Sequence, residues 1–183
     1  MKNDWHSIQK VSSYISTISN KMPGYHIFHE IMNACLTAKY SSDFNGKGLI
    51  IGGGGGKEIS IIQKSFPHAS LTLVDQSTVM IQLEKENISL SAQIQYVVAD
   101  FMKYSFHQKY RKVTSCLVIH FIQDKKFFLQ KVFDLLEEIG VFFLYTISLE
   151  ENKWDEKYWR QFMLNHQVTK RSMGSPEANL LSY

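Results

Sequence analysis

The sequence predicts an α/β protein with a doubly wound, mostly parallel sheet of about five strands and helices on both faces. Two observations carry this prediction. Short, largely apolar runs alternate along the chain with segments whose apolar residues recur at helical spacing. In addition, five consecutive glycines, Gly52–Gly56, follow the first apolar run directly and precede a helical segment. The length of 183 residues fits one domain, or one domain with a short appendage.

The amino-terminal part is predicted to be helical, with a break at Pro23-Gly24. After the break, apolar residues at 3.6-residue spacing predict one buried helix face, comprising Ile27, Phe28, Ile31, Met32, Cys35 and Leu36. The chain is therefore divided into an amino-terminal helical lid, a central core, for which a Rossmann-like cofactor-binding role is argued from the glycine run below, and a carboxy-terminal helix and tail. These parts are residues 1–45, 46–150 and 151–183.

The core pattern is one of alternating strands and helices. The predicted strands are Gly48–Ile51, Leu71–Val74, Ile94–Val98, Val113–Phe121 and Val141–Ile147. The predicted helices are Lys57–Ser65, a helix capped by Ser77 that runs to Asn87, Lys125–Ile139 ended by Gly140, and Glu151–His166. Strands that are apolar throughout indicate a parallel sheet buried on both faces, with its ligand at the carboxyl ends of the strands.

Composition and charge exclude several classes of protein. The hydrophobic fraction of 44% and the charged fraction of 20% are those of a soluble globular chain. The longest apolar stretches fall short of the ~20 residues that span a membrane, and the first residues carry no secretory signal, so a cytoplasmic location is expected. The net charge of +3 comes from dispersed lysines, which favours a charged small molecule over a nucleic acid as partner.

Cysteine and histidine spacing gives no indication of a metal site, and none is predicted. Cys35 and Cys116 lie in apolar segments without a CxxC pair, so both are expected to be small core residues in a reducing compartment.

The glycine run predicts a close approach of a ligand to bare backbone at a strand-to-helix turn. A flexible linker is the alternative, but the run is held between two regular elements. A phosphate-binding loop of the form GxxxxGK[ST] does not fit, because Glu58 follows Gly56-Lys57 and Ile51 occupies the first glycine position. The dinucleotide form GxGxxG fails as well, since its last glycine would fall on Lys57.

The spacing Gly52-x-Gly54-x-Gly56 instead resembles motif I of class I S-adenosylmethionine-dependent methyltransferases, and the resemblance extends from about residue 22 to 162. Asp75, at the end of the second strand, looks like the acid that binds the ribose hydroxyls. Asp100-Phe101, after the third strand, is similar to the family's adenine-binding pair. The resemblance implies S-adenosylmethionine as cofactor, S-adenosylhomocysteine as product, and a cofactor site that comprises Gly52, Gly53, Gly54, Gly56, Asp75, Gln76, Asp100 and Phe101.

Two further residues enter through the same resemblance. The segment Met22–Tyr25 is similar to one in small methyltransferases of this group that include carboxy-S-adenosylmethionine synthase, which implies that Tyr25 lines the methionine end. A packed aromatic at a helix start is the alternative. His120, at the end of the fourth predicted strand, is the candidate cofactor contact and general base, with a capping or pocket-lining role as the alternative. Weaker candidates for the base are Tyr104, His107 and Asp124.

The sequence departs from the family pattern at three points. Ile50 stands where motif I has an acid, so a contact to the methionine amino group is missing or supplied elsewhere. The all-glycine loop also resembles that of spermidine synthases, but the acidic motif that follows the fourth strand in those enzymes is absent. The last two strands of the family sheet have no counterpart in the tail. The fifth strand would then be an exposed apolar edge, which another subunit of a homodimer, the tail or the amino-terminal helices would cover.

These observations predict a methyltransferase that acts on a small-molecule acceptor. The alternatives are a non-catalytic module that binds S-adenosylmethionine or a partner on the same fold, and a transferase of a carboxymethyl or aminopropyl group. Ile50 and the shortened sheet favour the module more than they would in a typical family member.

Overall fold

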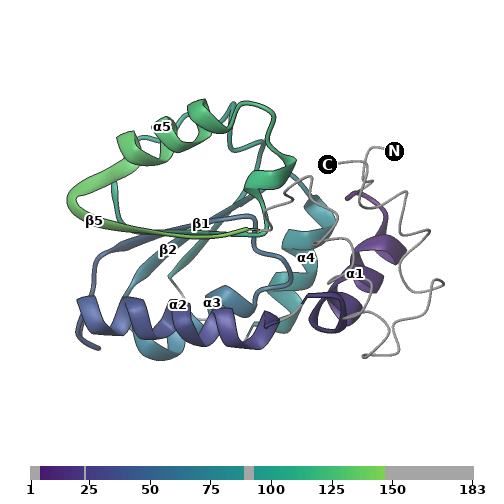
Figure 1. The fold of residues 1–183 in the computed structure, drawn as a ribbon, viewed down its shortest axis with the longest axis horizontal. Coiled ribbons are helices and arrows are strands. Elements are labelled where there is room, and N and C mark those ends of the chain that lie inside the picture. Colours follow the sequence, from purple (N-terminus) through teal and green to yellow (C-terminus); the bar gives the residue numbers. More distant parts are fainter. Residues whose placement is uncertain (1–4, 23, 89–92, 147–183) are drawn as a thin grey trace, which may run out of the picture.

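The computed structural model describes residues 5–22, 24–88 and 93–146, and within them it has the predicted α/β architecture. Five parallel strands form one sheet in the order β3-β2-β1-β4-β5 (Figure 1). The strands are β1 Lys47–Ile51, β2 Ser70–Asp75, β3 Ile94–Val98, β4 Tyr110–Cys116 and β5 Leu136–Tyr145. The helices are α1 Ile8–Lys21, α2 Tyr25–Lys39, α3 Lys57–Ser65, α4 Thr78–Asn87, the short 3-10 helix η1 Ile119–Phe121, and α5 Lys125–Leu135.

Helices cover both faces of the sheet, as predicted. In Figure 1, α2 and α3 lie below the sheet and α5 lies above it. Side chains alternate along a strand, so Ile50 of β1 belongs to the apolar cluster under α2, α3 and α4, whereas Leu49 and Ile51 belong to the cluster under α5. The β3–β4 connection, residues 99–109, contains no helix, which leaves α5 as the main cover of its face.

Helix α2 packs on the sheet through a narrower stripe than the sequence predicted. Phe28, Met32 and Leu36 recur every fourth residue and are buried. Ile27 and Ile31 were expected on the same face, but they are 59% and 51% exposed. The predicted core position of Cys35 is wrong for the same reason, because this thiol is exposed; only Cys116 is buried.

The fourth strand is shorter than predicted. It ends at Cys116, and the predicted continuation to Phe121 is wrong because Leu117 adopts a left-handed φ of 58°, which no strand can accommodate. The turn buries Leu117 against Ile18 and Met22 of the amino-terminal segment, and the chain then forms η1. The predicted end of the strand is therefore a turn at the sheet's carboxyl edge.

The boundary between the last helix and strand also differs from the prediction. Helix α5 ends at Leu135, and β5 begins at once, so Gly140 lies inside the strand and does not end the helix. A bulge in the β4–β5 pairing explains the glycine, since an added Cβ would come within 3.2 Å of the Tyr110 carbonyl oxygen. An ion pair of 2.8 Å between Arg111 and Glu137 joins the two strands at this point.

Among the described residues, β5 is an end strand of the sheet, and one of its faces is covered by α2: the Tyr145 and Phe28 rings stack at 3.9 Å. The predicted helix Glu151–His166 and the predicted strand end at Ile147 lie outside the described residues. Within the described ranges, the structure has no helix of the length and apolar character needed to cross a membrane.

Candidate functional site

A cavity of about 440 Å³ opens at the carboxyl ends of β1, β2 and β4. This is where a doubly wound sheet places its ligand. It brings together six of the predicted site residues, namely Gly52, Gly54, Asp75, Gln76, Asp100 and Phe101. Gly53, Gly56, Tyr25 and His120 are not among the lining residues.

The glycine loop has a backbone that side chains could not adopt. The φ angles are 74° at Gly52, 54° at Gly54, 102° at Gly55 and 83° at Gly56, all in the left-handed region. Gly53 is required for space, because an added Cβ would overlap the carboxyl of Glu84 and lie 2.5 Å from Leu73. The five glycines thus form a loop with bare backbone toward the cavity.

Asp75 ends β2 beside this loop. Its Oδ1 accepts a hydrogen bond of 2.7 Å from the Ser77 amide, which fixes the carboxyl at the cavity wall. Burial raises the pKa of Asp75, and hydrogen bonds from the Ser77 and Gly53 amides partly oppose this rise. Asp100 follows β3 in the same manner, since its Oδ1 accepts a 2.9 Å bond from the Met102 amide.

Two buried carboxyl groups that the sequence analysis missed lie beneath the loop. Glu84 of α4 is 0% exposed and its Oε1 accepts the Gly55 amide at 3.3 Å. Glu58 of α3 is 3% exposed. Burial raises the pKa of Glu84 to about 8, with Asp75 adding to the rise, and burial raises that of Glu58 to about 7.

The charge around the loop decides which ligand it fits. A glycine loop that cradles a pyrophosphate presents its amides to negative charge. Here the Glu84 carboxyl interacts electrostatically with both Asp75 and Glu58, and each of these acids would repel a phosphate when it is ionised. One oxygen of Glu84 and one of Glu58 also lack hydrogen-bond partners. The residues present therefore fit a nucleoside that carries positive charge, such as S-adenosylmethionine, better than a dinucleotide.

An aromatic cover from the amino-terminal segment lies over the same cavity. Trp5 and Tyr14 line it, and the Trp5 ring makes edge contacts with Tyr14 at 5.2 Å and with Phe121 at 5.8 Å. The Ser77 hydroxyl, which also caps α4, donates to the Trp5 carbonyl oxygen. The sequence analysis named no residue of this segment, although an aromatic residue within a predicted lid was a usable signal.

His120 lies beside the cavity and not in its lining. Its Nδ1 is 3.5 Å from the Thr146 hydroxyl of the chain that follows β5, whereas the next residue, Phe121, lines the cavity. Burial, with Lys125 as a second cause, lowers the pKa of His120 to about 4. The imidazole is therefore neutral at physiological pH.

Tyr25 is half-buried under the sheet, where it contacts the rings of Phe28 and His29. Burial and the nearby Glu58 carboxyl raise the pKa of Tyr25 to about 12.

The weaker candidates for a base differ in whether they line the cavity. Asp124 lines the cavity, but its Oδ1 accepts the Phe127 amide at 2.8 Å and so caps α5. Tyr104 packs against Phe106, and neither Tyr104 nor His107 lines the cavity.

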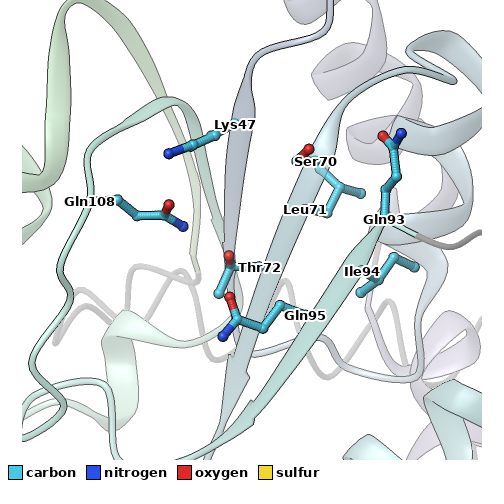
Figure 2. A pocket seen from close by; sticks show the side chains of 8 residues that line it. All are labelled: Lys47, Ser70, Leu71, Thr72, Gln93, Ile94, Gln95 and Gln108. Carbon is cyan, nitrogen blue, oxygen red and sulfur yellow. The ribbon is translucent and has the colours of Figure 1, made fainter.

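A second cavity, of about 310 Å³, lies at the opposite end of the sheet. Figure 2 shows Thr72 and Gln95, which are register partners on β2 and β3, together with Lys47 and Gln108. The hollow is polar and contains none of the predicted site residues. It lies on the face where the β3–β4 connection has no helix, which explains why the start of the strands is open there.

A doubly wound parallel sheet with a glycine loop after β1 and acids after β2 and β3 defines a nucleoside-binding protein of the Rossmann-like class. The methyltransferase domain family matches residues 49–140, half of the chain, and the chain belongs to this family. The predicted membership of the S-adenosylmethionine-dependent methyltransferase family is thereby confirmed. The particular similarity to carboxy-S-adenosylmethionine synthase is not shown by these comparisons.

Several solved structures share this fold. A methyltransferase from Methanococcus maripaludis superimposes with a TM-score of 0.67 at 14% identity, over 100% of this chain and 84% of that one. The N-methyltransferase NodS from Bradyrhizobium japonicum, in complex with S-adenosylhomocysteine, gives 0.58 at 16% identity over 72% and 71%.

Coclaurine N-methyltransferase, bound to N-methylheliamine and S-adenosylhomocysteine, gives 0.54 at 16% identity. That match covers 63% of this chain but only 35% of the coclaurine enzyme. The comparison with curated protein sequences finds no match.

Proposed function

We propose that this chain transfers the methyl group of S-adenosylmethionine to a small-molecule acceptor in the cytoplasm. The observation that carries the proposal is the cavity in which Gly52, Gly54, Asp75 and Asp100 meet, with buried carboxyls behind the glycine loop. The cofactor agrees with the fold neighbours that were solved with its product bound. An amino pentose methyltransferase from Micromonospora echinaspora, solved with S-adenosylmethionine, shares the fold and supports a small-molecule acceptor.

Each lining residue has a role that its chemistry permits. The Asp75 carboxylate would accept the two ribose hydroxyls, and Gln76 would extend that contact. Asp100 would accept the adenine amino group, and Phe101 would pack against the base. The loop of Gly52–Gly56 would approach the sulfur and the methionine chain closely, and Gly53 and Gly56 would act by shaping the loop rather than by lining the cavity.

The cofactor, when bound, supplies a methyl group on a cationic sulfur, and the chain supplies position. Rate acceleration in an in-line displacement comes chiefly from holding the acceptor in line with the methyl group and the sulfur. Trp5 and Phe121 would exclude water from the site. His120 remains the proposed base for acceptors that must lose a proton, and its low pKa keeps it in the neutral form that a base requires.

A non-catalytic cofactor-binding module is the second candidate. The observation that favours it is the position of His120, which lies outside the cavity lining, together with the apolar Ile50 on β1. A carboxymethyl or aminopropyl transfer on the same scaffold would use the same nucleoside contacts, and product analysis by mass spectrometry would distinguish it.

Calorimetric titration of the full chain with S-adenosylmethionine and S-adenosylhomocysteine tests the proposal. We expect both to bind, and we expect Asp75→Ala to weaken both by about 100-fold, because two hydrogen bonds to a charged group are lost. Asp134→Ala, on the exposed side of α5, is the matched control and should leave both affinities unchanged. Failure of the parent chain to bind either compound would refute the cofactor site, and binding without turnover on a broad acceptor panel would favour the module.

We also propose a homodimer, because among the described residues β5 is an end strand and apolar side chains are exposed near it. Apolar side chains are exposed on β5 and the adjacent helix, where Phe133 is 71% and Ile139 58% exposed. Surfaces of this kind are commonly covered by another chain. Light scattering should give twice the chain mass for the parent and the single mass for Ile139→Lys, and a monomeric parent would remove the proposal.

A further inference from the structure

We propose that Glu58 of α3 binds the methionine ammonium group of S-adenosylmethionine, in place of the carboxylate that Ile50 cannot provide. The inference rests on the proposed function, because it assigns one end of the same cofactor. It makes a helix residue, and not a strand residue, the acid of the methionine subsite.

Glu58 lies directly behind the cavity wall. Its carboxyl group hydrogen-bonds with the thiol of Cys116, and Cys116 lines the cavity. The side chain is 3% exposed, and its Oε1 has no hydrogen-bond partner. A buried carboxyl oxygen without a partner is costly, which makes it a place where a ligand donor would be strongly stabilised.

Within the described part of the chain, the Glu58 carboxyl forms no ion pair. The groups that interact electrostatically with it are Tyr25, Cys116 and Glu84, and none of them is cationic. The first two carry no charge at neutral pH, because burial raises the pKa of each further above its usual value. A cation placed beside this buried carboxyl would therefore be stabilised, and the methionine ammonium group is such a cation.

The neighbouring acceptors match an ammonium group as well. Thr114 of β4 has a buried hydroxyl group that lies against the Glu58 carboxyl. An ammonium group carries three donors, and it can use a carboxylate and a hydroxyl at once. Ile50 of β1 is the register partner of Thr114 on β4. Because Glu58 lies against Thr114, its carboxyl is near the position where β1 presents only the apolar side chain of Ile50.

Glu84, the other buried acid, is placed for a different task. Its Oε1 is engaged by the Gly55 amide, and its side chain fills the space that Gly53 leaves open. It supports the glycine loop from α4. Glu84 therefore serves as the matched control, because the same change from carboxyl to amide is made in a buried group that does not touch Cys116.

The experiment compares two ligands on the full chain by calorimetry. S-adenosylhomocysteine carries the amino acid, and 5′-methylthioadenosine is the same thioether nucleoside without it. Glu58→Gln should weaken S-adenosylhomocysteine by about tenfold or more, since a charged hydrogen bond is lost, and should change 5′-methylthioadenosine by less than about twofold. Glu84→Gln should shift both ligands by the same factor.

Circular dichroism and thermal melting establish that each variant folds. If Glu58→Gln does not fold, Glu58→Asp, which keeps the charge on a shorter side chain, should produce the same selective loss to a smaller degree. An equal loss of both ligands, or no loss of either, overturns the assignment of Glu58. Failure of both ligands to bind the parent chain would instead overturn the cofactor site itself, so the two failures are distinguishable.

Discussion

Both ends of the sheet bury ionisable side chains, but the surroundings of these side chains differ. At the carboxyl end, Glu58 and Glu84 lie beneath the glycine loop with one oxygen each lacking a partner. At the amino end, Lys112 of β4 is 2% exposed and its ammonium nitrogen also lacks a hydrogen-bond partner. Around that nitrogen, however, the faces of three aromatic rings form a cage: the ring centroids of Phe44 and Tyr40 lie 3.8 Å and 4.6 Å from it, and Phe66 is the third ring.

This difference distinguishes the candidate ligand site at the carboxyl end from a buried charge at the amino end that only packs against other side chains. The faces of the three rings attract the Lys112 ammonium group, and Lys112 lines neither cavity. The acids at the other end have no such cover, and Cys116 and the loop glycines connect them to a cavity. Unsatisfied buried charge therefore indicates function only where it lies beside open space.

The largest effect is expected at the carboxyl end, from Gly53→Ala. The added methyl group would overlap the Glu84 carboxyl and crowd Leu73, so the glycine loop or α4 must move. We expect a loss of about 2 kcal/mol of unfolding free energy, in the range for overpacking, and weaker binding of S-adenosylhomocysteine by about tenfold. Thermal melting and calorimetry would measure the two effects.

Gly54→Ala is the matched control for this change. Its Cβ would meet no atom within 4 Å, so the only cost is the left-handed backbone, about 1 kcal/mol. A larger stability loss for Gly54→Ala than for Gly53→Ala would contradict the idea that Glu84 is packed against the loop.

Much of the site could be predicted from local sequence, because a glycine run between a strand and a helix, with acids after the next strands, is a short-range pattern. Gly52, Asp75 and Asp100 were predicted in this way, and they line one cavity. The buried acids had a weaker signal. Glu58 is four residues before Ile62, and Glu84 is three after Ile81, so both lie on apolar helix faces. Their position on the apolar face of a helix could therefore have predicted that both carboxyl groups are buried.

The rest depended on contacts between distant segments. The end of β4 is set by Leu117, whose left-handed turn packs against Ile18 and Met22, almost a hundred residues earlier in the chain. The early start of β5 follows from a bulge opposite β4 and from the pair Arg111–Glu137. Helical periodicity predicted that α5 continues to Ile139. In the structure the strand pairing with β4 overrides this local preference, and the helix ends at Leu135.

The smallest effect is expected at the amino end, from Lys112→Met, which should leave S-adenosylhomocysteine binding unchanged. Burial lowers the pKa of Lys112 to about 7, whereas a lysine in the unfolded chain titrates near 10.4. Between these values the unfolded state binds more protons, so the stability of the parent rises with pH. Methionine fills the same cage without a charge to desolvate.

Lys112→Met should therefore raise the melting temperature at pH 7 by a few degrees, about 1 kcal/mol, with the gain shrinking toward pH 10. Lys64→Met, an exposed lysine on α3, should change neither value. If Lys112→Met instead lowers the melting temperature at pH 7 and the loss persists at pH 10, the parent's amine must be held by more than its ring contacts, and the amino end would no longer be the closed counterpart of the cofactor end.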